Sequence, residues 1–169
     1  IGGEPLVVKE HYDWLEKIVE SGYAKNIRLT YNTNGTTVPD TLLDLWDNFK
    51  SINIGLSVDA YGDLAYYVRF PSKWKNIERN SQKLADYAQH RGELTVHVHT
   101  TISLLNIHDL PQLLKWSMKN FKTRNFYSSE LHTNIGFQKL TPSFNMVTEP
   151  TYLNVCHLPD EEKEIVNAM

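Results

Sequence analysis

The chain of 169 residues has very little cysteine, since Cys156 is its only one. A single thiol excludes an internal disulfide and fits a reducing compartment, so the sequence predicts a cytoplasmic protein. It also excludes an iron–sulfur cluster held by these residues alone, because such clusters are bound by several thiolates. Although His157 follows it, neighbours on a strand point to opposite faces, so we expect a buried, unreactive cysteine.

The sequence also lacks long apolar runs and charge runs of basic residues. No apolar stretch approaches the roughly 18 residues that would cross a bilayer. The formal charge is only -3, so neither nucleic acid nor an acidic membrane surface is expected as a partner. An apolar content of 41% and a charged content of 22% fit one globular domain.

What is present is an alternation of two periodicities, which is typical of β/α units with a parallel sheet. Apolar residues at helical spacing predict a helix that ends near Gly22, one that opens at Pro39-Asp40, one from about Trp74 to His90, and one after an N-cap at Asp109. Strands are predicted between these helices, at residues 26–33, 52–58 and 94–102.

The pattern weakens after residue 120. Residues 125–131 fit one more strand, residues 141–150 are predicted to form a loop, and residues 152–158 are predicted to be short and extended. Pro159-Asp160 starts a terminal helix, and the acidic residues 160–162 suit its first turn.

The three predicted strands are apolar on one side only, whereas strands covered on both faces are apolar throughout. Side chains two residues apart share a face, so each strand carries a polar row. The rows are Arg28, Thr30, Asn32 and Asn34; Asn53, Gly55, Ser57 and Asp59; and Thr95, His97, His99 and Thr101. With helices outside, these rows line a common polar interior, which implies a ligand or water. The alternative is an antiparallel sheet with one face in solvent, which the intervening helices disfavour.

The opening stretch Gly2-Gly3-Glu4-Pro5 can form a turn that holds an ammonium group. Glycines let the backbone approach a ligand closely, and the turn offers carbonyl oxygens and a carboxylate. An isolated stretch of this kind is also compatible with an ordinary turn.

Several blocks follow that stretch in a recognisable order. They are Thr33-Asn34-Gly35-Thr36, Leu56-Ser57-Val58-Asp59, Arg69, and Thr100-Thr101 with Asn106. Together with residues 2–5 they resemble the radical S-adenosylmethionine (SAM) superfamily, most closely the branch with twitch or SPASM extensions. The resemblance covers about residues 1–110, and residues 150–163 resemble the end of the catalytic domain in twitch-containing members.

This resemblance implies an α/β fold, a partial (β/α)6 TIM-like barrel with parallel strands and helices on the outside, truncated at its N-terminus. Residues 1–169 are then one domain from a radical SAM catalytic core. Residues 1–125 would be clear β/α units, and residues 126–169 the last strand and the connection toward a twitch or SPASM extension. The family binds a [4Fe–4S] cluster through a CxxxCxxC loop upstream of the opening block, and its ligands are absent from this chain.

The implied activity of the parent enzyme is reductive cleavage of SAM to a 5′-deoxyadenosyl radical, which abstracts a hydrogen atom from a substrate. Peptides or proteins are the substrates suggested by analogy. The 169-residue chain alone is predicted not to cleave SAM. Its strand near Ile27 would be an exposed edge, through which the chain is expected to self-associate.

The family's binding residues can be carried over where the blocks match. Gly2, Gly3 and Glu4 would hold the methionyl ammonium of SAM, and Ser57 and Arg69 its carboxylate or ribose. Asn34 and Asp59 belong to matched blocks and are expected to face the same interior. Two departures are Ala60 in place of a glycine and a longer loop before Arg69.

Further candidates come from the third strand and the tail. His97, His99 and Thr101 are predicted to line the substrate space; the two histidines could also bind a metal if a third ligand joined them. Glu130 is predicted either to face the cavity or to lie in an exposed loop. Two other functions stay open, a non-catalytic half-barrel that binds a nucleotide or peptide, and a TIM-like hydrolase or aldolase fragment.

Overall fold

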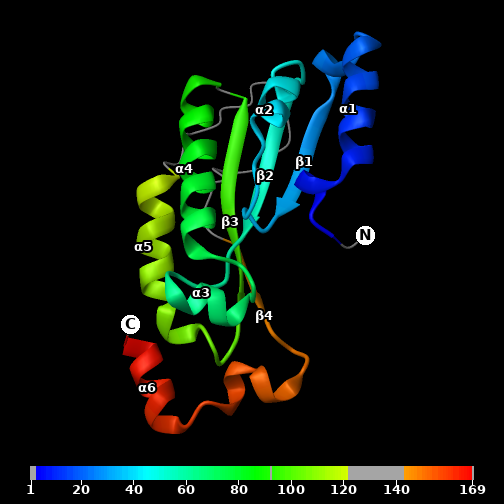
Figure 1. Cartoon of the computed structure of the whole chain (residues 1–169). Coiled ribbons are helices and arrows are strands. Elements are labelled where there is room, and N and C mark those ends of the chain that lie inside the picture. Colours follow the sequence, from blue (N-terminus) through cyan, green and yellow to red (C-terminus); the bar gives the residue numbers. More distant parts are fainter. Residues whose placement is uncertain (1–2, 92, 122–142, 169) are drawn as a thin grey trace, which may run out of the picture.

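The computed structural model describes residues 3–91, 93–121 and 143–168, and these form one parallel sheet with helices packed on it (Figure 1). The strands lie in the order in which they occur in the chain, and each pairs in parallel with the next. They are β1 (Arg28–Thr33), β2 (Ser51–Ser57), β3 (Leu94–Ile102) and β4 (Ser143–Met146). The predicted parallel pairing is confirmed, and the antiparallel alternative is wrong.

Helices connect the strands as predicted. The α-helices are α1 (Lys9–Glu20), α2 (Asp40–Trp46), α3 (Asp63–Val68), α4 (Trp74–His90), α5 (Leu110–Asn120) and α6 (Asp160–Ala168). α3 falls in the longer loop that was predicted before Arg69. None of the described helices is long and apolar enough to cross a membrane.

The core lies on one side of the sheet. Leu29 and Tyr31 of β1 and the apolar residues of β2 and β3 pack against Leu15 of α1, Trp46 of α2 and Leu84 of α4. Trp46 and Leu84 are fully buried, as are Ile54 and Leu56 of β2. Because side chains alternate along a strand, this packing turns the polar rows to the other face, as predicted.

The described sheet is open, with β1 and β4 at its edges. The (β/α)6 barrel is therefore not confirmed, since the described residues supply four strands that do not close. The predicted strand at residues 125–131 and Glu130 lie outside the described residues.

The tail differs from its predictions. Residues 141–150 were predicted to form a loop, yet Ser143–Met146 pairs with the last residues of β3. The segment predicted as extended contains two 3₁₀ turns, Thr151–Leu153 and Val155–His157. Cys156 lies in the second turn and is exposed, so its predicted burial is wrong.

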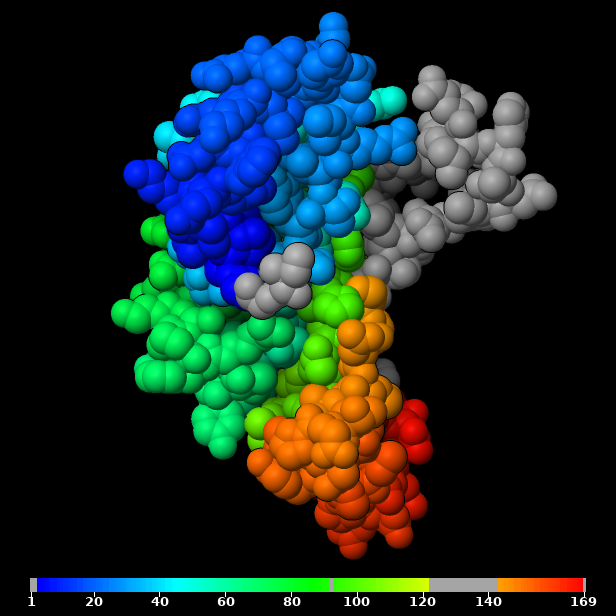
Figure 2. Space-filling model, turned by 90° about the vertical axis from the view of Figure 1, so that its right-hand side faces the viewer, coloured from blue at the N-terminus to red at the C-terminus, as the bar shows by residue number. Residues whose placement is uncertain are grey.

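The carboxyl ends of the strands gather other parts of the chain. The N-terminal turn lies beside the end of β1, α3 lies beyond β2, and the segment after β4 extends past the end of the sheet (Figure 1). In a space-filling view the last residues, drawn orange and red, project below the rest of the protein (Figure 2).

Candidate functional site at the carboxyl ends of the strands

The carboxylate of Glu4 is bound to the end of β1. Its Oε1 accepts a hydrogen bond from Thr33 Oγ1 at 2.6 Å, and its Oε2 accepts one from the backbone N–H of Asn34 at 2.8 Å. Oε1 also accepts a hydrogen bond from Leu6 N, which caps the 3₁₀ turn Pro5–Val7. Two of the matched sequence blocks, far apart in the chain, are therefore in direct contact.

The residues on either side of Glu4 fix this turn. Gly3 has φ of 114°, a left-handed conformation that residues with a Cβ rarely adopt. Leu6 is fully buried in the core and anchors the other side. Gly2 lies outside the described residues, so its predicted role stays a prediction.

A second charged group lies at the ends of β2 and β3. Asp59 is 8% exposed, and its Oδ2 accepts a hydrogen bond from Arg69 Nε at 2.5 Å. Its Oδ1 accepts one from the backbone N–H of Thr101 at 2.8 Å. The guanidinium is thus oriented by a carboxylate that β3 holds in place, and the Arg69 side chain remains 37% exposed.

Helix α3 explains how a longer loop still places Arg69 beside Asp59. Arg69 is the residue at which α3 ends, and the helix returns the chain toward the sheet. Ala60, the other departure from the family pattern, is 1% exposed. No described residue other than glycine has a positive φ, so this position does not require a glycine.

Asn106 links the ends of β2 and β3, a role that the sequence did not reveal. It is 1% exposed, and its Nδ2 donates to the carbonyl oxygens of Asp59 at 2.7 Å and Thr101 at 2.8 Å. Its Oδ1 accepts a hydrogen bond from Ser103 N at 2.7 Å. Asp109 occupies the N-cap position of α5, as predicted, but its side chain accepts no hydrogen bond from the helix. Its carboxylate accepts a hydrogen bond from the backbone N–H of Tyr61.

The polar rows form a wall on the face of the sheet away from the core, which we call the polar wall. Asn32, Gly55 and His97 lie side by side on neighbouring strands. A Cβ at position 55 would lie 2.5 Å from Asn32 Oδ1 and 3.3 Å from His97 Nε2. The two polar side chains therefore approach each other above Gly55, in space that any larger residue would fill.

His97 has a buried polar atom on the polar wall. Its Nδ1 is buried and has no hydrogen-bond partner among the described residues. Burial, and then the neighbouring His99, lower the pKa of His97 below its usual value of 6.5. The imidazole is therefore neutral near pH 7, and one of its ring nitrogens is buried without a partner among the described residues.

His99 is instead held by β4. Its Nδ1 lies 2.6 Å from Ser143 Oγ and its Nε2 lies 3.1 Å from Asn145 Nδ2. Both partners fall in the segment that was predicted to be a loop, so no sequence pattern pointed to them. In the described part of the chain, no three His, Cys, Asp or Glu side chains are placed to hold a metal ion.

The predicted residues thus fall into two groups. Glu4, Asp59 and Arg69 lie at the carboxyl ends of the strands. The polar wall carries Ser57, His97, His99 and Thr101, and Ser57 pairs in register with His99. The side chain of Asn34 turns back on its own loop, because its Oδ1 accepts hydrogen bonds from the N–H and hydroxyl of Thr36. Only its backbone N–H reaches the site.

Comparisons with known proteins identify a shared fold. No protein-family profile and no curated protein sequence matches the chain. Solved structures of SuiB from Streptococcus suis do match, with a TM-score of 0.54 and 15% sequence identity over 70% of this chain. SuiB has been solved bound to S-adenosylmethionine and bound to the precursor peptide SuiA. The chain spans about a quarter of the length of SuiB, 25–26%, and within that part it has the α/β fold of SuiB.

Proposed function

We propose that this chain is the SAM-binding part of a radical SAM enzyme. One observation carries the proposal: Glu4 contacts the Thr33-Asn34 block, and Asp59 contacts both Arg69 and Thr101, at the same ends of one parallel sheet. Ligands of open parallel sheets bind at the carboxyl ends of the strands. The SAM complex of SuiB, a protein of the same fold, gives independent support.

The residues present suit the groups of SAM. The Glu4 carboxylate and the carbonyl oxygens of residues 2–3 would hold the methionyl ammonium, because both are acceptors. Arg69 uses Nε for Asp59, and no described residue accepts a hydrogen bond from its two Nη atoms. Those donors suit a carboxylate, and Ser57 would serve the same carboxylate or the ribose.

SAM, when bound and reductively cleaved, would supply a 5′-deoxyadenosyl radical for hydrogen abstraction. The residues of this chain would orient SAM and exclude water. They do not suit a [4Fe–4S] cluster, because Cys156 is the only thiol and is exposed. We therefore assign no step through a cluster to these residues, and we expect the chain by itself to bind SAM without cleaving it.

The polar wall is the proposed substrate side of the site. It presents amide, hydroxyl and imidazole groups, from Asn32, Asn53, Ser57, His97 and Thr101. Such neutral donors and acceptors match the groups of a peptide backbone. The SuiB complex with precursor peptide SuiA supports a peptide or protein substrate.

The test is SAM binding by isothermal titration calorimetry on the 169-residue chain. Arg69→Gln is expected to weaken SAM binding about tenfold, the loss of one charge-assisted interaction. Arg79→Gln, which removes an exposed arginine of α4, is the matched control and should bind as the unchanged chain does. Equal affinity of the two variants, or no binding by the unchanged chain, would contradict the proposal.

A second measurement separates an enzyme from a binding domain. The complete protein that contains this chain, reconstituted under anaerobic conditions and reduced, should release 5′-deoxyadenosine from SAM. The Glu4→Ala variant should release less, because the contact between the N-terminal turn and β1 is lost. SAM binding without release of 5′-deoxyadenosine would support the non-catalytic half-barrel instead.

A further inference from the structure

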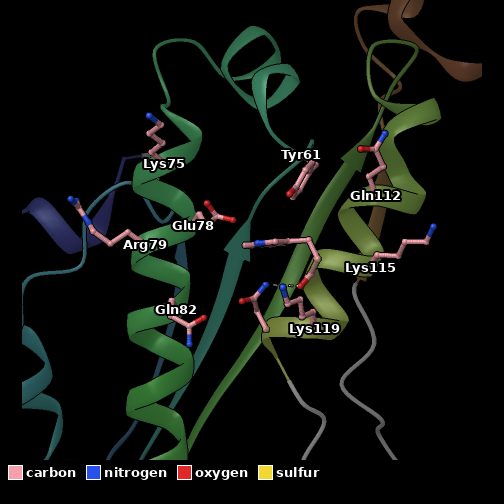
Figure 3. Close-up of a pocket in the computed structure, with 10 residues that line it drawn as sticks. Tyr61, Lys75, Glu78, Arg79, Gln82, Gln112, Lys115 and Lys119 are labelled. Atoms are coloured by element: carbon pink, nitrogen blue, oxygen red, sulfur yellow. Dashed lines mark hydrogen bonds between the residues drawn. The ribbon is translucent and has the colours of Figure 1, made fainter.

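The helical side of the protein carries a groove unrelated to the candidate site. It lies between α4 and α5, has a volume of about 640 Å³, and is shown in Figure 3. Its charged lining residues are the cations Lys75, Arg79, Lys115 and Lys119 and the single acid Glu78. Three net positive charges thus gather on one surface of a chain whose formal charge is -3.

These cations form two pairs of like charges, one pair on each helix. Lys75 and Arg79 are four residues apart on α4, and Lys115 and Lys119 are four residues apart on α5, so each pair places like charges on one face of its helix. Like charges at this spacing destabilise a helix. Within the described residues none of the four side chains forms an ion pair or a hydrogen bond, so their charged groups are left to other partners.

The floor of the groove supplies a second observation. Trp116 is 6% exposed and lines the groove, and its buried Nε1–H has no acceptor among the described residues. A buried donor without an acceptor is costly, and an incoming acceptor can relieve that cost. In Figure 3, Glu78 and Lys119 point toward the space between the helices, whereas Lys75 and Arg79 extend outward from α4 and Lys115 extends outward from α5, on the two outer sides of the groove.

We propose that this groove docks an acidic α-helix of a partner protein. The four-residue spacing on α4 and α5 corresponds to about 6 Å along a helix axis, which is also the spacing of acids at every fourth position of a partner helix. The carboxylates would meet the rim cations, as charged residues flank the contact in helical pairs. Nucleic acid is disfavoured, because Glu78 lies in the groove and the chain is negatively charged overall.

The test uses a fluorescent peptide helix with glutamate at every fourth position, and the same peptide with glutamine instead. The unchanged chain should bind the glutamate peptide at low salt, more weakly as salt rises, and should not bind the glutamine peptide. The double variants Lys75→Gln/Arg79→Gln and Lys115→Gln/Lys119→Gln should each weaken binding about tenfold. Circular dichroism would verify that both variants keep their helices.

The matched control is the double variant Lys9→Gln/Lys25→Gln, which removes the same kind of charge from exposed positions of α1 and of the turn before β1. It should bind the glutamate peptide as the unchanged chain does. Three results would overturn the proposal: equal weakening in the control, equal binding of the glutamine peptide, or tighter binding of a single-stranded oligothymidylate that depends on the same four cations. SAM binding enters none of these measurements, so the proposed function and this proposal can fail separately.

Discussion

The two faces of the sheet differ in how completely their side chains are satisfied. On the face that the helices cover, Ile52, Ile54 and Leu56 of β2 are at most 1% exposed and pack into the core. On the polar wall, Asn53 and Ser57 of the same strand are half-buried, and His97 next to them has a ring nitrogen with no partner among the described residues.

This difference indicates that the two faces of each strand have separate roles. The apolar residues provide the free energy that holds the sheet to its helices, because burial of apolar area is the main stabilising contribution to folding. The polar residues contribute little to that packing, so they are available to bind a ligand. Four tests of this division follow, in decreasing order of expected effect.

The largest effect is expected from adjacent residues on opposite faces. Leu56→Ala should lower the free energy of unfolding by about 3 kcal/mol, because it leaves a cavity in the core. Ser57→Ala should change it by less than about 0.5 kcal/mol, yet should weaken SAM binding. Urea denaturation and calorimetry measure the two quantities, and similar losses of stability in both variants would remove the distinction between the faces.

Asn106→Ala should have the next largest effect. The carbonyl oxygens of Asp59 and Thr101 would lose a buried donor, so the free energy of unfolding should fall by about 2 kcal/mol. Asn48→Ala is the control, because the Asn48 side chain also donates to two carbonyl oxygens but is exposed. Equal losses of unfolding free energy in the two variants would show that the burial of Asn106 does not make its hydrogen bonds more important for stability.

Gly55→Ala should cost about 1 kcal/mol, since its Cβ would displace the flexible ends of Asn32 and His97. The displacement should be visible as a change in the NMR shifts of the His97 ring. If the NMR shifts of the His97 ring stayed unchanged in Gly55→Ala, the ring would not lie over Gly55 as it does in the structure. His90, exposed at the end of α4, provides the reference signal.

The smallest effect concerns pH. The pKa of His97 in the folded chain is lower than 6.5, the usual value for a histidine, which applies to the unfolded chain. As the pH falls, the unfolded chain therefore binds more protons than the folded chain. Stability should therefore decrease on acidification below about pH 6.5. His97→Asn should reduce this decrease but not abolish it, because burial also lowers the pKa of His11. If the melting temperature of the His97→Asn variant depended on pH as that of the unchanged chain does, a neutral, buried His97 would be contradicted.

Much of this arrangement could be predicted from the sequence because it follows from periodicity. The alternation in residues 52–58 and 94–102 gives both the strands and the side of the sheet on which Ser57 and His97 lie. The contact between Glu4 and Thr33 could be anticipated only from the order of the blocks, since no local pattern relates residues so far apart.

The features that could not be predicted depend on contacts that produce no periodic pattern in the sequence. β4 has four residues, and its Phe144 and Met146 are exposed, so the sequence lacks a buried alternation there. It becomes a strand through its pairing with β3. The amide of Asn34 was expected to face the interior, but the nearby Thr36 offers it two local donors. Short-range hydrogen bonds of asparagine commonly compete in this way.

The order of the strands sets the reach of the polar wall. Because β1, β2, β3 and β4 are adjacent in sequence order, the outer two strands are separated by three inter-strand spacings, about 14 Å in total. An extended peptide advances about 3.4 Å per residue, so roughly four of its residues could cross the wall at right angles to the strands. A peptide laid this way at the level of Asn32, Gly55 and His97 would meet β1, β2 and β3, whereas β4 pairs with β3 only from His99 onward and would be met nearer the carboxyl ends.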